Sequence, residues 1–407
     1  MLIRRHPALL TALTLLALAT LAITLGSEAY GLGALATSTV KLLGKTLCLA
    51  LAAVAMDLVW GYAGILSLGH MAFFALGGYM IGQWLMYART AEGVAATLAT
   101  APIPPTPAEL AQGTAAQIFG VVGSTDLPWS WAFAHSLPAQ LVLVLAVPGL
   151  LAALFGWLAF RARVNGVYLS ILTQAMTLAL ALWLFQNDAG FRGNNGLSGL
   201  QNIPGAADVP QSVISIRFLW ASAFALACGM VLATWITGGK FGSVIRAIRD
   251  DEARVRFLGY PVETFKLTVF TLSAMICGVA GALYYPQAGI INPAELMPIA
   301  SIYLAVWVAI GGRGRIYGAI VGAIAVSLLS SWFTGGRAPD LTLGPLTIRW
   351  VDWWQVLLGF GFVAVTLLAP RGLSSLWDAL MRLRPPRRHG ADLGPDLGAL
   401  REREAQA

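Results

Sequence analysis

Long apolar runs recur along almost the whole chain, separated by short polar or glycine-rich segments. A helix of about 20 apolar residues is long enough to cross the hydrocarbon core of a membrane. By that length the pattern predicts an all-α, polytopic transmembrane helical bundle of about ten spans, two of them short or interrupted by glycine. We expect the spans at roughly 7–25, 39–60, 66–88, 138–160, 165–187, 217–237, 264–286, 297–311, 316–334 and 351–369.

Composition agrees with membrane insertion. Of the 407 residues, 57% are hydrophobic and only 11% are charged, whereas a soluble domain is about 25% charged. The first apolar run has the basic start of a signal peptide, but no clear small-residue cleavage site follows, so we interpret it as the first span. The net charge of +7 is interpreted as a mark of orientation and not as a nucleic-acid-binding surface.

The basic residues indicate which ends of the spans face the cytoplasm. If the N-terminus lies inside and the spans alternate, most of the 26 Lys and Arg residues fall in inner segments, as the positive-inside rule requires. Both termini are therefore predicted to be cytoplasmic, with longer outer connections at 89–137, 188–216 and 335–350. We divide the chain into a transmembrane domain at 1–384 and a flexible, proline-led cytoplasmic tail at 385–407.

The sequence has no motif for catalysis or for metal or nucleotide binding. The "GKT" at 44–46 lies in an apolar run and lacks the first glycine of a P-loop, because Thr39 stands at that position. The three cysteines, Cys48, Cys228 and Cys277, also lie in apolar runs without ligand spacing, and we interpret them as small buried hydrophobic residues. We therefore expect no enzyme, no metal and no cofactor held by this chain.

The most informative polar segment is "GGKFGSVIRAIRDDEARVRFLGYPVETFKL" at 238–267. Its apolar positions suit an amphipathic helix that breaks at Gly259, followed by a second short helix that starts at Pro261. The apolar positions are Val244, Ile245, Ile248, Val255 and Leu258. Periodicity alone leaves two interpretations open: a helix that lies on the membrane with its arginines at anionic headgroups, or a helix that docks a cytoplasmic partner.

This segment resembles the "EAA" coupling loop of bacterial ABC importer permeases, most of all that of the branched-chain amino acid permease family. The likeness rests on Glu252-Ala253 and on Gly259, although Val255 and Arg256 stand where the family often has Ala. In such importers the loop inserts into a groove of a cytoplasmic ATPase subunit and follows ATP binding and hydrolysis. The resemblance thus implies a coupling loop at about 238–264, with coupling residues Arg246, Arg249, Asp250, Glu252, Ala253 and Gly259.

The resemblance covers most of the chain. "GYAGILSLGHMAFFALGGYM" at 61–80, "SAMICGVAGALYYPQAGIINPAEL" and "GGRGRIYGAIVGA" are similar to motifs of the same family. It implies an inner-membrane, multi-pass subunit that works beside a second permease chain, two ABC ATPase subunits that bind the ATP, and a periplasmic solute-binding protein. "FQNDAGFRGNNGLSGL" is most similar to the urea-importer branch, so urea or a related small amide is the expected cargo.

Two alternatives stay open at this point. A branched-chain amino acid cargo would call for charge complements, which the outer and mid-membrane segments largely lack. An ATP-independent channel or secondary transporter would have no need of the arginine-rich loop.

Several polar residues and glycines near the spans are candidates for the solute path or for gating. The glycines of 61–80, among them Gly77 and Gly78, either allow close helix packing or line the path. For His70 we expect a structural or gating hydrogen bond, because it and Asp57 fall near the inner membrane face, where water or headgroups would satisfy them. The remaining solute-path candidates are Thr173, Gln174, Asn194 and Asn195, the last two equally well explained as part of a glycine-rich turn.

Overall fold

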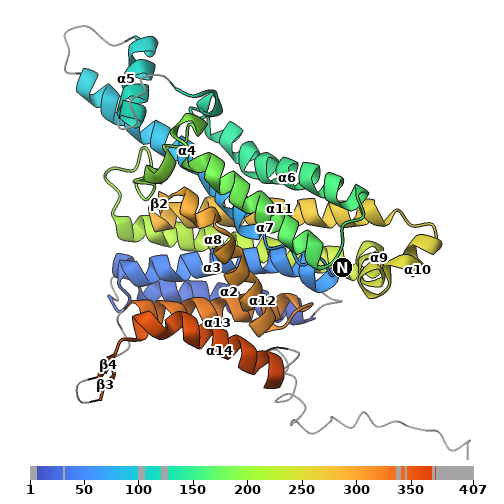
Figure 1. The fold of residues 1–407 in the computed structure, drawn as a ribbon. Coiled ribbons are helices and arrows are strands. Elements are labelled where there is room, and N and C mark those ends of the chain that lie inside the picture. Colours follow the sequence, from blue (N-terminus) through green and yellow to red (C-terminus); the bar gives the residue numbers. More distant parts are fainter. Residues whose placement is uncertain are drawn as a thin grey trace, which may run out of the picture.

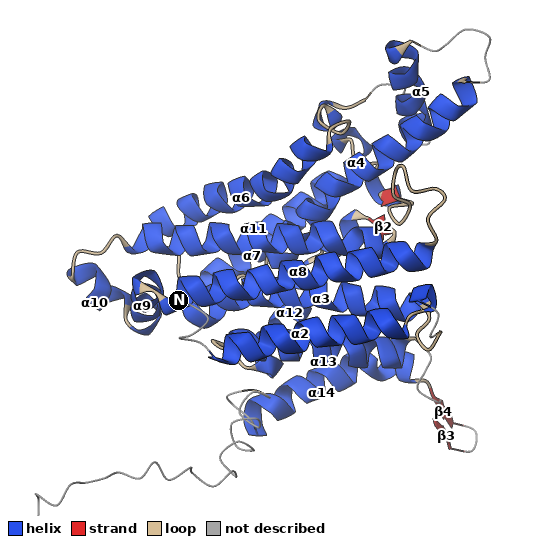
Figure 2. Cartoon of the chain, turned by 180° about the vertical axis from the view of Figure 1, so that it is seen from behind, coloured by secondary structure: helices blue, strands red, loops and turns tan. Residues whose placement is uncertain are grey.

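Each predicted span coincides with a helix in the computed structural model, which describes residues 7–30, 33–99, 106–120, 127–335, 341–343, 346–368 and Gly372. Figure 2 shows that the described chain is almost entirely helical, as the apolar pattern predicts. The helices are α2 (Pro7–Gly26), α3 (Thr37–Asp57), α4 (His70–Leu98), α5 (Pro107–Phe119), α6 (Leu137–Arg161), α7 (Val167–Phe185), α8 (Gln211–Gly238), α9 (Lys240–Asp250), α10 (Glu252–Phe257), α11 (Val262–Ala288), α12 (Pro298–Gly311), α13 (Ile316–Thr334) and α14 (Trp350–Leu368).

Strands are few and short within the described ranges. β1 (Leu197–Ser198) pairs with β2 (Ile290–Ile291), and β3 (Leu341–Leu343) pairs with β4 (Leu346–Ile348), both antiparallel. The all-α, polytopic fold class is therefore confirmed. Among the described helices, seven are long and apolar enough to cross a membrane. The count of ten crossings stays a prediction, because α12, for example, has only 14 residues.

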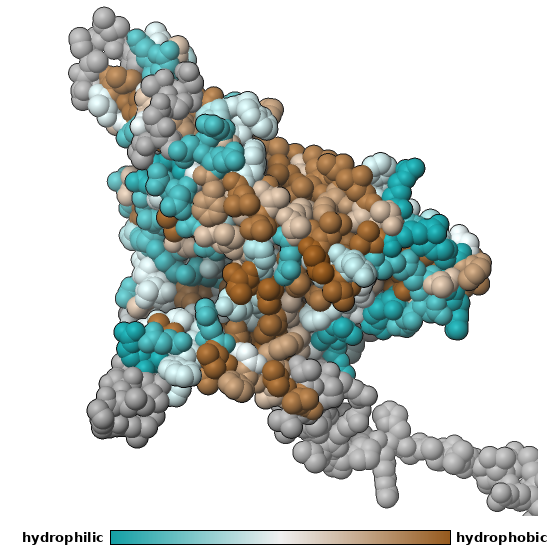
Figure 3. All heavy atoms as spheres, viewed as in Figure 1, coloured by the Kyte–Doolittle hydropathy of each residue, from teal (hydrophilic) through white to brown (hydrophobic). Residues whose placement is uncertain are grey.

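The helices run side by side and expose polar segments at both ends of the bundle. Figure 1 places α9 and α10 at one end, together with the described start of the chain, and α5 and the β3–β4 hairpin at the opposite end. The face shown in Figure 3 has a hydrophobic central region between hydrophilic ends, as a membrane-spanning surface requires. The topology, including the cytoplasmic orientation of either end, stays a prediction.

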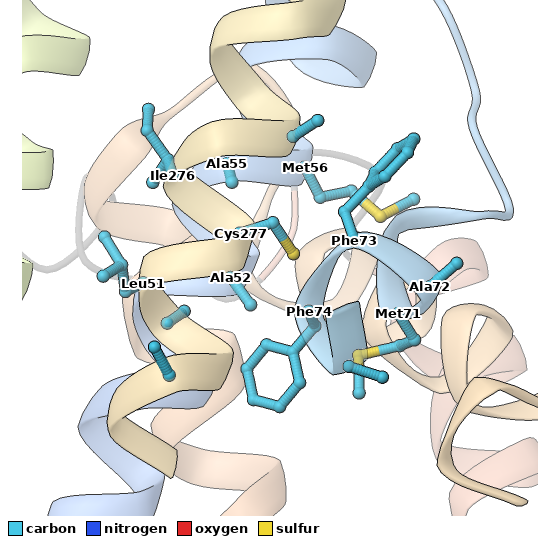
Figure 4. Packing of buried hydrophobic residues seen from close by; sticks show 14 of the residues in the cluster. Leu51, Ala52, Ala55, Met56, Met71, Ala72, Phe73, Phe74, Ile276 and Cys277 are labelled. Carbon is cyan, nitrogen blue, oxygen red and sulfur yellow. The ribbon is translucent and has the colours of Figure 1, made fainter. Parts of the chain in front are cut away.

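Helix α11 lies at the centre of the bundle, where it packs against α3, α4 and α6. Small residues allow this contact, since a Cβ added at Gly77 of α4 would overlap the backbone of Gly278 of α11. Figure 4 shows Ala52 and Ala55 of α3 beside Cys277 of α11, at the same close approach. Tight backbone contact replaces the hydrophobic effect as the main source of helix association inside a bilayer.

The three cysteines of the apolar runs differ in their burial. Cys48 and Cys277 are buried as expected, but the interpretation of Cys228 was wrong, because its side chain is exposed on α8. A small apolar residue on a membrane-spanning helix can face lipid as well as the protein core, so an apolar run does not show which of its residues are buried. The tail at 385–407 lies outside the described residues.

Candidate functional site

The α9–α10 loop is built from two short helices that meet at an acidic cap. α9 ends at Asp250, and Asp251 has extended backbone while its Oδ1 accepts a hydrogen bond from the Arg254 amide at 3.0 Å. This is an N-cap, which starts a new helix. The predicted break at Gly259 is therefore preceded by an earlier break at Asp251. The predicted second short helix from Pro261 was wrong, because the chain enters the 27-residue α11 there.

The apolar face of this loop is only partly covered. Ile245, Ile248 and Val255 are buried, as the amphipathic pattern predicts. Leu258, assigned to the same face, is instead 71% exposed, and its neighbour Phe257 is 92% exposed. The helix has already ended at Phe257, so its period no longer applies to Leu258. The loop therefore ends in two exposed apolar side chains.

Glu252 is engaged inside the protein and not free for a partner. Its carboxylate accepts hydrogen bonds from Arg256 at 3.0 Å and from Lys266 at 2.5 Å. The Lys266 ammonium also donates to Asn165 Oδ1 at 2.9 Å, in the turn between α6 and α7. Of the residues predicted at the ATPase contact, Ala253 and Gly259 are exposed and Glu252 is half-buried. Glu252 thus connects α10 to α11, and Lys266 extends this connection to the α6–α7 turn.

Two arginines fix α9 to its surroundings. Arg249 donates to the Gly61 carbonyl at 2.8 Å and also pairs with Asp250 at 3.0 Å. Arg246 donates to the Thr237 carbonyl near the end of α8 at 2.9 Å. The predicted coupling residues Arg246 and Arg249 therefore hold the loop against the bundle, and Arg249 reaches the glycine-rich turn that follows α3.

That turn runs from the π-helical segment Leu58–Tyr62 to the start of α4 at His70. Asp57 closes it against the α12–α13 turn, because its Oδ1 accepts a hydrogen bond from the Gly314 amide at 2.7 Å. The Arg313 guanidinium lies 5.4 Å from the Trp60 ring centroid, a cation–π contact between the same two segments. The expectation that water or headgroups satisfy Asp57 was wrong, because Asp57 is fully buried and bonded by backbone.

His70 makes the structural hydrogen bond that the sequence predicts. Its Nε2 lies 2.7 Å from Ser273 Oγ, and Ser273 donates to the Ala55 carbonyl at 2.5 Å. A hydroxyl has one hydrogen, so Nε2 is the donor to Ser273. His70 is fully buried, so the expected contact with water or headgroups was wrong. The hydrogen bonds join α3, α4 and α11, while a part in gating stays a prediction.

The glycines at 77 and 78 lie in helix contacts. A Cβ at Gly78 would overlap the Tyr285 ring, as one at Gly77 would overlap the backbone of Gly278. At Gly82 the nearest atom would be Leu197 Cδ1 at 3.1 Å, which is the end of a flexible side chain. The packing interpretation of Gly77 and Gly78 thus agrees with the geometry, and a place on the solute path stays a prediction.

The other solute-path candidates are not brought together. Thr173 is buried and its Oγ1 accepts a hydrogen bond from the Leu68 amide at 3.0 Å, beside the glycine-rich turn. Gln174 is half-buried on the same helix. Asn194 and Asn195 are exposed in a short 3₁₀ turn that precedes β1, at the end of the bundle opposite α9 and α10 (Figure 1).

Sequence reasoning missed a pocket at that opposite end. It has a volume of about 350 Å³ and is lined by Arg89 and Arg192 among other residues. These arginines come from α4 and from the segment after α7, so no local motif joins them. The only available signal was "FRGNN", in which an arginine stands inside a glycine-rich turn.

Comparisons with known proteins match residues 38–366 to the family described as "Branched-chain amino acid transport system / permease component". The branched-chain amino acid permease LivM of Escherichia coli (strain K12) is 24% identical over 312 residues, covering 70% of this chain and 61% of the relative. LivM of Salmonella typhimurium is 28% identical over 44% of this chain and 48% of the relative. The ribose import permease RbsC of E. coli (strain K12) is 25% identical over 46% and 58%. The matches thus span between about half and three fifths of these relatives, and no solved structure matches the chain.

Proposed function

Because the chain belongs to the family of branched-chain amino acid transport system permease components, we propose that it is the permease subunit of an ABC importer. The family match over 38–366 is the observation that carries the proposal, and it contains the whole α9–α10 loop. The subunit lies in the bacterial inner membrane. Its partners are a second permease chain, two cytoplasmic ABC ATPase subunits and a periplasmic solute-binding protein. The chain is not an enzyme, and ATP is bound by the ATPase subunits.

In this proposal the exposed part of α10 meets the ATPase, and internal contacts transmit the movement. Ala253 and the exposed Phe257 and Leu258 form the outward surface of the loop. Glu252 and Lys266 pass a displacement of α10 to α11. Such a loop shifts as a unit because its charged groups are paired within the bundle.

A second connection leads from α9 to the centre of the bundle. Arg249 bonds to Gly61, and Asp57 of the adjoining segment bonds to Gly314 between α12 and α13. A movement of α9 would therefore reach both turns at this end of the bundle. Alternating access follows when these turns and α11 move relative to the helices that they contact. The chemistry of ATP hydrolysis stays with the partner subunits.

The proposal names a class of cargo and two candidate cargoes within it. A small polar solute is the class that the family implies, and branched-chain amino acids are favoured because the family description and LivM carry that name. Urea or a small amide is the second candidate, supported by the resemblance at 185–200 and by the exposed amides of Asn194 and Asn195, which can bond to a neutral planar amide.

The experiment that tests the proposal is co-expression of the chain with candidate ATPase subunits, followed by affinity purification. The proposal expects the ATPase to co-purify with the wild-type chain and to be lost from an Ala253→Arg variant. An Ala132→Arg variant is the matched control. Ala132 is exposed directly after the 3₁₀ helix Trp129–Trp131, far from α10 in the sequence. If no ATPase accompanies the wild-type chain, an ATP-independent channel or secondary transporter replaces the proposal.

Uptake measurements then separate the two cargoes. Cells that express the complete importer would be given labelled leucine or labelled urea, each in competition with the other and with short amides. Leucine uptake that urea fails to inhibit supports the amino acid cargo. Urea uptake that leucine fails to inhibit supports the urea-importer resemblance.

A further inference from the structure

The pocket at the end opposite α9 and α10 has two guanidinium groups in its wall. It lies between α4, α5 and the segment from Arg192 to Ser198, and it opens to solvent. Its volume of about 350 Å³ falls in the range of sites that hold small molecules, about 300–1,000 Å³. The lining combines charge, neutral polar groups and one apolar side chain, namely Arg89, Arg192, Thr90, Gln117, Ser198 and Met86.

Arg192 lies in a tight turn, directly before the 3₁₀ helix Gly193–Asn195. Its backbone is left-handed, with φ of 63°, which only a small share of non-glycine residues adopt. The residue is 9% exposed. Among the described residues its guanidinium makes two long contacts, from Nη1 to the Gly196 carbonyl at 3.5 Å and to Met86 Sδ at 3.8 Å. Strained residues of this kind concentrate at binding and catalytic sites.

The charge of Arg192 lacks a counter-charge within the described part of the chain. Its Nε is buried and has no hydrogen-bond partner there. Burial lowers the pKa of Arg192, and no described carboxylate acts in the opposite direction. An arginine stays protonated in proteins even so. A guanidinium that is largely removed from water and has no described anion beside it can gain a charge-assisted hydrogen bond from an anionic ligand.

Arg89 supplies the second positive charge from α4. Its side chain is exposed, and Nη1 donates to the Gly199 carbonyl at 3.3 Å. Two guanidinium groups around one cavity offer planar pairs of donors, the geometry that suits a carboxylate. Thr90, Gln117 and Ser198 add neutral polar groups, and Met86 provides an apolar surface for an aliphatic side chain.

We propose that this pocket binds the carboxylate of a small α-amino acid. The inference rests on the proposed function, in which an amino acid is the favoured cargo, and it assigns the pocket to the outer vestibule of the predicted topology. In this proposal Arg89 and Arg192, which both line the pocket, supply the positive charge that the carboxylate of a zwitterion calls for. A neutral cargo such as urea would leave both charges without a partner.

The test uses the full chain, purified and placed in lipid nanodiscs. Binding of labelled L-leucine is measured and compared with that of leucinamide, which keeps the side chain and the amine but lacks the carboxylate. We expect leucine to bind at least tenfold more tightly than leucinamide. Arg89→Gln, an exposed position that leaves the fold intact, should remove most of that preference. Arg217→Gln, an exposed arginine outside the pocket, should leave it unchanged.

Arg192 is tested by two variants because its conformation is strained. Arg192→Gln should abolish the preference for leucine. Arg192→Lys keeps the charge without the planar donors and should weaken leucine binding less than Arg192→Gln does. A monodisperse size-exclusion profile shows whether each variant is folded. If Arg192→Gln fails to fold, Arg89→Gln and Arg192→Lys still decide the question.

Three outcomes would overturn the inference. Equal binding of leucine and leucinamide, or an Arg89→Gln variant with the wild-type preference, would show that the pocket does not recognise a carboxylate. A third outcome combines two results: the wild type shows no preference for leucine, and the arginine variants lose binding to a purified solute-binding protein. The arginines would then bind acidic side chains of that protein and not the solute. Co-purification of the ATPase measures the proposed function separately, so the two failures are distinguishable.

Discussion

The ion pair between Glu252 and Lys266 should stabilise the end of the bundle that holds α9 and α10. In a Glu252→Gln variant the Lys266 ammonium, 8% exposed, loses its anionic partner and keeps the amide oxygen of Asn165 at 2.9 Å. Breaking a buried ion pair costs about 3–5 kcal/mol, whereas an exposed pair contributes about 0–1 kcal/mol. Because the Glu252 side chain is 27% exposed, we expect an intermediate loss. We estimate it at about 2 kcal/mol in the free energy of unfolding.

A double-mutant cycle measures this interaction directly. Lys266→Met should cost less, about 1 kcal/mol, since Glu252 then keeps its bond to Arg256. The double variant should recover part of the loss, with a coupling energy of about 1–2 kcal/mol. The free energy of unfolding would be obtained by SDS titration in mixed micelles, followed by circular dichroism.

The matched control for this cycle is Arg254→Gln on the same helix. Its ion pair with Asp251 is exposed, with side chains 80% and 46% accessible, so the change should stay within about 0.5 kcal/mol. A Glu252–Lys266 coupling energy no larger than that control would refute the argument that Glu252 is an internal connector.

Substitutions at Gly78 and His70 test the packing of α4. Gly78→Leu should abolish folding and transport, because the Tyr285 ring occupies the space that the new side chain needs. Gly359→Leu is the control, since no described atom lies within 4 Å of a Cβ added there. In a membrane fraction the amount of folded protein should stay unchanged in this control. His70→Gln should retain most of the transport, since an amide can still donate to Ser273, and His70→Leu should lose about 1–3 kcal/mol of stability in the SDS titration. Equal losses in both His70 variants would contradict the assignment of that hydrogen bond.

Much of the architecture follows from the sequence, because membrane insertion demands continuous apolar runs with internally bonded backbone. The ten runs all form helices, although the third begins at His70 and not at the predicted residue 66. The loop was less well predicted at its ends. Asp251 followed by Glu252 carried an N-cap signal, but the apolar period was continued past it to Leu258.

The details of the candidate sites could not be predicted, because they depend on residues far apart in the chain. His70 meets Ser273 across 203 positions, and Asp57 meets Gly314 across 257. Neither partner is distinguishable from other serines and glycines in an apolar segment. Arg192 illustrates the same limit, since the pocket that it lines forms only when α4 and α5 lie beside its turn.

The central claim, that the exposed surface of α10 couples transport to a separate ATPase, is tested most directly by uptake into proteoliposomes. These would contain the chain, its second permease, the ATPase subunits and the solute-binding protein. The account predicts that labelled leucine accumulates only when ATP is supplied to the ATPase side, and that Ala253→Arg abolishes this uptake while Ala132→Arg retains it. Uptake that proceeds equally without ATP, or that survives Ala253→Arg, would contradict the account.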